Sequence, residues 1–176
     1  CLTQISLEGT GELMSHKRTA VILATGGTPM VRAAHSQGKP AYGVGPGNVP
    51  VYVDRSADLE KAARYIVGSK AFDHSVICAT EQAVVADKPI AGRLKELMIS
   101  EGAYFVDDAQ ADALRRTLFN PDGGMNVATV GKSPQYIAGL AGIQVPGKAR
   151  ILVAHLNQVG REEPLSREKL TTVLGW

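Results

Sequence analysis

Cys78 is the residue of this chain best placed to do chemistry. It lies in a short apolar run between a predicted helix and a predicted strand over residues 81–87. A cysteine attacks a carbonyl carbon as its thiolate, which a nearby base or positive charge favours. His74 and Glu81 are close in sequence, but a lone histidine often caps a helix end and a lone carboxylate is usually structural. Spacing alone therefore leaves two interpretations open, a nucleophile or a buried thiol that fills the core.

Two glycine-rich stretches could bring the backbone close to a ligand. Residues 25–28, Thr-Gly-Gly-Thr, follow an apolar run and precede a predicted helix, so their N–H groups could bind a nucleotide phosphate. They lack the three-glycine dinucleotide pattern, and the glycines could simply close a tight turn. Residues 43–48 carry three glycines at alternate positions, which permits close approach to a ligand or a sharp change of direction between strands.

A third candidate is the pair of carboxylates at Glu162 and Glu163. Adjacent carboxylates before a proline usually belong to a solvated turn, but one of them could accept hydrogen bonds from ribose hydroxyl groups. The two cysteines and four dispersed histidines lack the spacing of a metal site, and we expect none.

Composition narrows the class of protein. Of the 176 residues, 44% are hydrophobic and 20% charged, which is typical of a globular chain. The net charge of +2 is scattered and only 5% of residues are aromatic, so we expect no nucleic-acid partner. No apolar run approaches the roughly 18 residues that span a membrane. Two cysteines, Cys1 and Cys78, do not make a secreted disulfide framework, although they could pair; we expect free thiols in the cytoplasm.

Predicted strands alternate with predicted helices along the chain. The strands are expected at residues 20–24, 41–44, 51–53, 83–86, 104–106, 149–154 and 173–176. The helices are expected at residues 7–16, 30–37, 56–70, 89–100, 109–119 and 134–140, with Ser56 capping the third. This alternation predicts an α/β fold with a mostly parallel sheet and flanking helices.

Six stretches, taken in order, resemble the aldehyde dehydrogenase superfamily and above all its CoA-acylating branch. That branch includes acetaldehyde and propionaldehyde dehydrogenases and the aldehyde-oxidising half of bifunctional aldehyde–alcohol dehydrogenases. The stretches are residues 13–16, 22–27, 43–48, 69–73, 77–82 and 162–165. The block around Cys78, together with the Gly-Pro-Gly-Asn loop, is the specific part of the match.

The resemblance implies a role for each candidate residue. Cys78 would be the nucleophile that forms a thiohemiacetal with an aldehyde and, after hydride transfer to NAD, a thioester. The backbone N–H of Cys78 would lie in the oxyanion hole. Glu163 would hold the nicotinamide ribose. The turn that meets the cofactor pyrophosphate would consist of Thr25, Gly26, Gly27 and Thr28.

The resemblance also suggests where the acyl group goes. The hydrolytic branch carries a general-base glutamate, whereas the corresponding position here is Val44 or a neighbour in residues 43–45, none of which is acidic. Without that base, water is poorly activated toward the thioester, so a thiol acceptor such as coenzyme A can attack instead.

Family members are much longer than this chain. We therefore expect a fragment that is incomplete at both ends, with residues 1–47 ending a nucleotide-binding domain and residues 48–176 forming part of a catalytic domain. An upstream oxyanion-hole asparagine is missing, and Leu165 stands where many relatives have phenylalanine. The full-length enzyme is expected to be a homo-oligomer in the cytoplasm or in a bacterial microcompartment.

Two other functions stay open at this point. The chain could be a non-catalytic α/β binding or assembly module that kept the core of the fold and lost its chemistry. It could also come from a hydrolytic aldehyde dehydrogenase that releases free acid, which the missing base disfavours.

Overall fold

The computed structural model describes residues 2–176 and divides into two compact units, one ending at Pro46 and one running from Gly47 to Trp176. The suggested pairing of Cys78 with Cys1 concerns a residue outside the described range, and Cys78 carries a free thiol.

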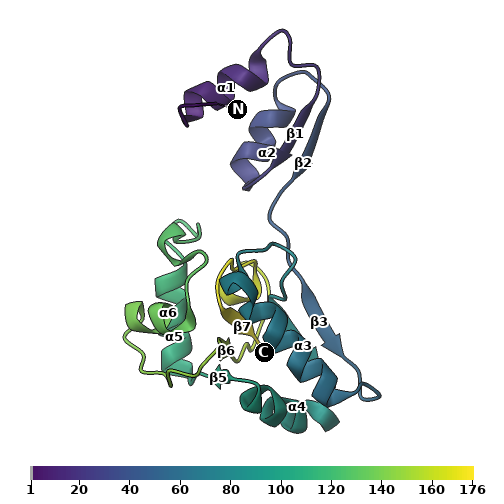
Figure 1. Cartoon of the computed structure of the whole chain (residues 1–176), viewed down its shortest axis with the longest axis vertical. Helices are drawn as coiled ribbons and strands as arrows, with labels where there is room; N and C mark the ends of the chain where they lie inside the picture. The colour runs from purple at the N-terminus through teal and green to yellow at the C-terminus, as the bar shows by residue number, and fades with distance from the viewer. Residues whose placement is uncertain (1) are drawn as a thin grey trace. The chain divides into compact units, whose positions relative to one another are not determined.

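The first unit is a two-stranded parallel sheet with two helices (Figure 1). Its elements are α1 (Leu7–Ser15), β1 (Ile22–Thr25), α2 (Thr28–His35) and β2 (Ala41–Val44). The small core consists of Ile22 and Ala24 of β1 and Ala34 of α2. Alternate residues of β1 are buried because successive side chains of a strand point to opposite faces of the sheet.

Gly43 allows α2 to pack closely against β2. A Cβ atom added at Gly43 would overlap Cγ1 of Val31 and lie 2.9 Å from Nε2 of His35, both on α2. Valine is stiff in a helix, so the overlap cannot be relieved cheaply. We therefore expect Gly43→Ala to lower the free energy of unfolding by about 1–3 kcal/mol in urea titrations. Gly11→Ala is the control, since nothing lies within 4 Å of a Cβ there, and it should stabilise α1 by about 0.5–1 kcal/mol. Equal stability of the two variants would contradict this packing role.

The second unit is a five-stranded, fully parallel sheet in the order β3-β4-β7-β6-β5. The strands are β3 (Pro50–Val53), β4 (Ala83–Ala86), β5 (Ala103–Phe105), β6 (Ile151–Ala154) and β7 (Val173–Gly175). The helices are α3 (Leu59–Ala71), α4 (Lys88–Ser100), α5 (Asp108–Leu118) and α6 (Pro134–Leu140). Short 3-10 turns lie at η1 (Phe72–Ser75), η2 (Val127–Thr129) and η3 (Pro164–Ser166).

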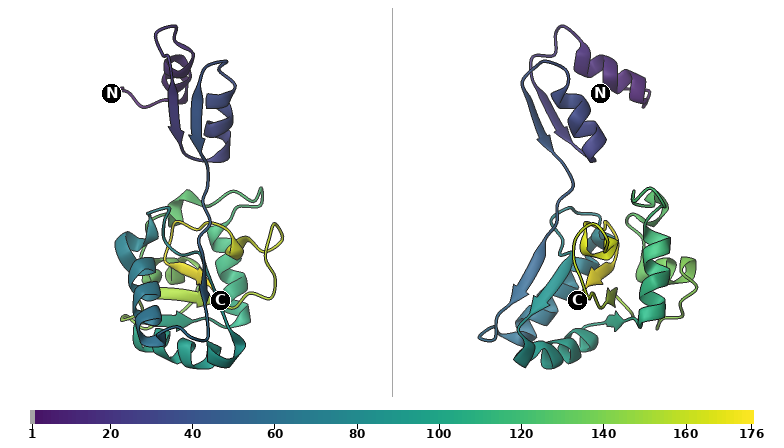
Figure 2. Two further views of the ribbon diagram at one scale, coloured as in Figure 1. Left: turned by 90° about the vertical axis from the view of Figure 1, so that its right-hand side faces the viewer. Right: turned by 180° about the vertical axis from the view of Figure 1, so that it is seen from behind.

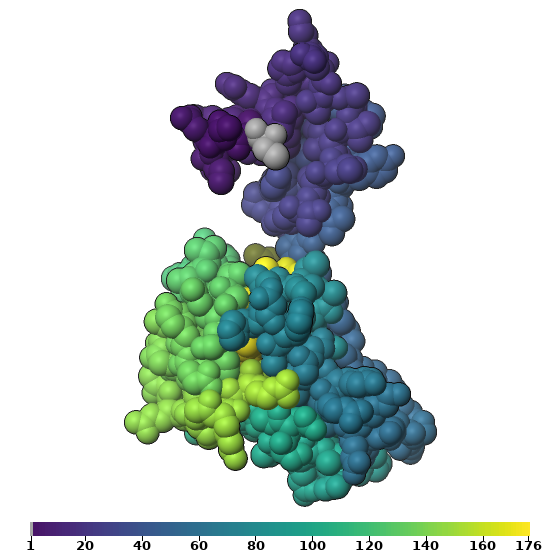
Figure 3. Space-filling view, viewed as in Figure 1, coloured from purple at the N-terminus to yellow at the C-terminus, as the bar shows by residue number. Residues whose placement is uncertain are grey.

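Helices cover both faces of this sheet, as Figures 1 and 2 show. Ile151 and Val153 of β6 pack into a core with α3 and α4, while Leu152 and Ala154 pack into a second core with α5 and α6. Because both faces are buried, β6 is a continuous apolar run. Strand β7 is also buried, and little of the yellow C-terminal segment reaches the surface seen in Figure 3.

The predicted α/β class with parallel sheets and flanking helices is confirmed. The predicted N-cap at Ser56 is wrong. Helix α3 is capped by Asp58, whose side chain accepts a hydrogen bond from the N–H of Lys61, and Ser56 instead binds the carboxylate of Asp54. The three 3-10 turns were not predicted. Among residues 2–176, the helices are too short or too polar to cross a membrane.

Candidate active site

The candidate residues of the second unit gather where three neighbouring strands begin. Residues 47–49 precede β3, residues 76–82 precede β4 and residues 163–172 precede β7. These strands are parallel and adjacent, so their amino ends lie at one edge of the sheet. Cys78 is exposed at this edge. A core thiol would be buried, so the structure does not support the interpretation of Cys78 as core filler.

The glycine-rich loop lies beside the turn that carries Cys78. A Cβ atom at Gly47 would be 3.5 Å from the carbonyl oxygen of Cys78, an ordinary van der Waals contact. The N–H of Gln82 donates to the carbonyl of Val49 at 2.9 Å, and the side-chain amide of Asn48 donates to the carbonyl of Ser166 at 2.9 Å. The loop thus joins the Cys78 turn to the segment before β7.

The Cys78 turn is entered through strained backbone. Asp73, His74 and Ser75 have φ angles of 48°, 49° and 63°, a left-handed conformation that costs about 1 kcal/mol or more per residue. Buried hydrogen bonds hold the turn on its inner side: the hydroxyl of Ser75 lies 2.7 Å from that of Thr80, which in turn donates to the carbonyl of Ile77. His74 is exposed, and within residues 2–176 it makes no hydrogen bond to Cys78.

Two buried lysines lie next to this turn, and sequence reasoning missed both. Lys70 and Lys169 have no exposed surface and share the side-chain oxygen of Gln82, which accepts from Lys70 Nζ at 3.2 Å and from the backbone N–H of Lys169 at 2.9 Å. Lys70 falls on the same helical stripe as Ala63, Ile66 and Val67, which was the available signal. Burial lowers the pKa of Lys70 to about 7, although nearby carboxylates such as Glu81 act in the opposite direction.

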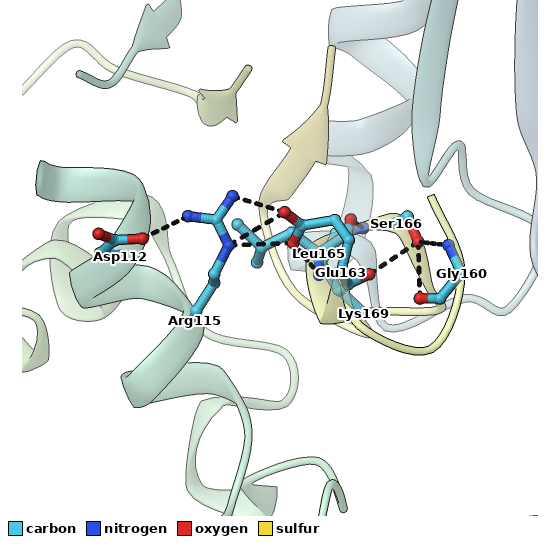
Figure 4. A network of polar contacts seen from close by, with 7 residues as sticks. All are labelled: Asp112, Arg115, Gly160, Glu163, Leu165, Ser166 and Lys169. Atoms are coloured by element: carbon cyan, nitrogen blue, oxygen red, sulfur yellow. Dashed lines mark hydrogen bonds and ion pairs between the residues drawn. The ribbon is translucent and has the colours of Figure 1, made fainter. Parts of the chain in front are cut away.

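Glu163 is buried and held by an arginine (Figure 4). Arg115 of α5 reaches its two carboxylate oxygens with contacts of 2.6–3.1 Å, and the N–H of Leu165 donates to Oε1 at 3.0 Å. Hydrogen bonding to Glu163 raises the pKa of Arg115, and Asp112 binds the other side of the guanidinium. The carboxylate therefore has a fixed position next to the Cys78 edge, while its predicted contact with ribose stays a prediction.

The predicted phosphate-binding turn belongs to the first unit. Gly26 donates to the carbonyl of Val44 at 3.0 Å, and Gly27 is the N-cap of α2 without a side-chain hydrogen bond. In the part of the chain that the structure describes, the N–H groups of Gly27 and Thr28 have no backbone acceptor. These free donors at a helix N-terminus fit a phosphate.

A cavity of about 720 Å³ lies beside Glu163 in the second unit. Its lining includes four arginines, Arg115, Arg116, Arg161 and Arg167. Asp122 and Glu162 also line it, and Glu163 and Asp112 neutralise Arg115. The charges therefore balance, and the cavity does not favour an anion. Among the described residues, no three His, Cys, Asp or Glu side chains converge on a metal position.

No model of a known protein family matches the chain. The chain is 43% identical over 176 residues to aldehyde-alcohol dehydrogenase 2 of Entamoeba histolytica, an alignment that covers 96% of this chain and 20% of the relative. A crystal structure of an acetylating aldehyde dehydrogenase from Geobacillus thermoglucosidasius matches with a TM-score of 0.95 and 47% identity over 99% of this chain.

The chain is homologous to one segment of the acetylating aldehyde dehydrogenases. A further similar structure is Rhodopseudomonas palustris propionaldehyde dehydrogenase with bound propionyl-CoA, with a TM-score of 0.86 and 35% identity over 97% of this chain. The chain spans about a fifth of the aldehyde-alcohol dehydrogenase and 37–38% of these two solved chains. The resemblance found in the sequence motifs is thus confirmed, and it applies to a part of these enzymes.

Proposed function

We propose that this chain is part of an enzyme that converts an aldehyde, NAD and coenzyme A to acyl-CoA and NADH through a thioester on Cys78. The observation that carries the proposal is the exposed thiol of Cys78 on a turn at the same sheet edge as Gly47 and Glu163. The homology to acetylating aldehyde dehydrogenases supports the reaction class.

In this mechanism Sγ of Cys78 attacks the aldehyde carbon, and the carbonyl oxygen becomes an oxyanion near the backbone N–H of Cys78. Bound NAD would accept the hydride that leaves this carbon. Loss of the hydride re-forms the carbonyl group and leaves a thioester on Cys78. The thiolate of coenzyme A then attacks the thioester and releases Cys78 as its thiolate.

The turn made by Thr25, Gly26, Gly27 and Thr28 would bind the pyrophosphate, with the free N–H groups of Gly27 and Thr28 as donors, and Glu163 would bind the nicotinamide ribose. We propose accordingly that residues 1–47 complete a nucleotide-binding domain and that residues 48–176 belong to a catalytic domain. The whole enzyme would be a cytoplasmic or microcompartment homo-oligomer.

The product distinguishes this proposal from hydrolysis. Val44 and its glycine neighbours offer no general base for water, so we expect the full-length gene product, given propionaldehyde, NAD and coenzyme A, to form propionyl-CoA in amounts that match the NADH. Mass spectrometry of the products measures this ratio. Omitting coenzyme A should lower steady-state NADH formation at least about tenfold. Propionate as the only product, with or without coenzyme A, would assign the chain to the hydrolytic class.

A further inference from the structure

We propose that Lys169 is a positioning residue for this reaction: its buried ammonium group fastens the turn that carries Cys78 to the turn that carries Glu163. The inference rests on the proposed function, because it concerns the residues that would hold the thiol and the ribose. Neither turn is long enough to bury a core of its own, so contacts between the two turns help to fix their relative position, together with the pairing of β4 with β7 and the Asn48 contact.

The contacts of Lys169 fit an ammonium group. Its Nζ donates to three backbone carbonyls, those of Gln82 at 3.0 Å, Leu165 at 2.6 Å and Arg167 at 2.9 Å. Three acceptors use all three N–H bonds of a protonated lysine, whereas a neutral amine has only two. The side chain therefore joins the start of β4 to the 3-10 turn η3 before β7.

The residues that Lys169 binds contact the two candidate site residues in turn. On one side, Gln82 donates through Nε2 to the carbonyl of Thr80 at 3.2 Å, and Thr80 closes the turn over Cys78 by binding the carbonyl of Ile77. On the other side, Leu165 donates its N–H to Oε1 of Glu163 (Figure 4). We name Lys169, Gln82 and Leu165 the lysine clamp.

The contacts and charges around the two buried lysines explain why Lys169, and not Lys70, holds the positive charge. Burial lowers the pKa of both amines, and two adjacent ammonium groups repel each other. Lys169 has three short acceptors and the nearby carboxylate of Glu163 to favour its charge. Lys70 has two longer contacts, at 3.2 Å to Gln82 Oε1 and at 3.4 Å to the carbonyl of Lys169, which a neutral amine satisfies. The carboxylates of Glu81 and Glu168 raise the pKa of Lys70, but burial lowers it by more.

Lys70 therefore supplies a matched control for Lys169. It is the same residue type, equally buried and in the same network, but it contacts neither Leu165 nor the Glu163 turn. We expect Lys169→Met in the full-length protein to raise KM for NAD and to lower kcat, each at least about tenfold, because misplacing a bound group by about 1 Å can cost on the order of 100-fold. Lys70→Met should change each by less than about threefold.

The measurements are steady-state kinetics with propionaldehyde, NAD and coenzyme A, and the rate of Cys78 alkylation by iodoacetamide in folded protein. Similar losses in both variants, or unchanged kinetics in Lys169→Met, would overturn the clamp. If Lys169→Met does not fold, Lys169→Gln keeps two donors and should show an intermediate rise in KM; an unchanged KM would equally overturn it. The Cys78→Ser variant separates the two proposals. An active Cys78→Ser enzyme would refute the role of Cys78 as nucleophile. If Cys78→Ser is inactive, the kinetics of the Lys169 variants decide whether the lysine clamp is correct.

Discussion

The Cys78→Ala variant of the full-length protein is expected to lose aldehyde oxidation by a factor on the order of 1,000 or more. Without Sγ no thiohemiacetal and no thioester can form, and removal of a covalent nucleophile has effects of this size or larger. The thiol is exposed on a turn held from its inner side by Ser75 and Thr80, so replacing it by a methyl group should leave the fold intact. The rate of NADH formation measures the loss.

Two controls show that the loss is chemical. Cys78→Ser keeps a polar group of similar shape and should bind NAD with an unchanged dissociation constant while staying inactive. In the unmodified protein, iodoacetamide should label Cys78 much faster than Cys1 near neutral pH. Normal turnover by Cys78→Ala, or equal labelling of the two thiols, would favour a non-catalytic module.

The Lys70→Met variant is expected to change how stability depends on pH. The folded-state pKa of Lys70 is lowered to about 7 from 10.5, so between these values the unfolded chain holds a proton that the folded chain has lost. The free energy of unfolding contributed by Lys70 therefore rises with pH over this range and is lowest at and below pH 7, where a charged amine is buried. Between pH 7.5 and 9.5, the wild-type protein should gain about 2 kcal/mol relative to Lys70→Met.

Urea unfolding of both proteins at several pH values measures this difference, and taking the difference cancels groups common to both. Lys61→Met is the control because Lys61 is exposed on the same helix. Its difference from wild type should stay constant over the same range. A constant difference for Lys70→Met would mean that the folded protein keeps Lys70 protonated.

The sheet could be predicted from the sequence because its strands are apolar runs bounded by turn residues. Strand β6 has core on both faces, and such a strand leaves a clear pattern. The cap at Asp58 was missed because serine and aspartate both cap helices well and only two residues separate them. The left-handed turn at residues 73–75 was missed because none of its residues is glycine.

The candidate site was predictable in part. Cys78 and the loop with Gly47 lie in recognisable motifs, and the residues of each motif are contiguous in the sequence. The partners of Glu163 are different, since Arg115 lies 48 residues away and its pairing depends on how α5 packs. Lys169 shows no periodicity that predicts burial, and lysine is rarely found in a core. Such side chains are identified only when the surrounding carbonyls are located.

The strand order also has a consequence for how the protein is made. Strand β7 follows the other four strands of this sheet in the sequence but lies between β4 and β6, pairing with Ala83 on one side and residues 152–154 on the other. During synthesis on a ribosome, the β3-β4 and β5-β6 pairs can form early, but they stay separate sheets until residues 173–175 emerge. The Cys78 turn precedes β4 and the Glu163 turn precedes β7, so the pairing of these two strands brings the turns together. A stalled or shortened nascent chain would therefore present two unjoined sheet edges, where chaperone binding or aggregation would be expected.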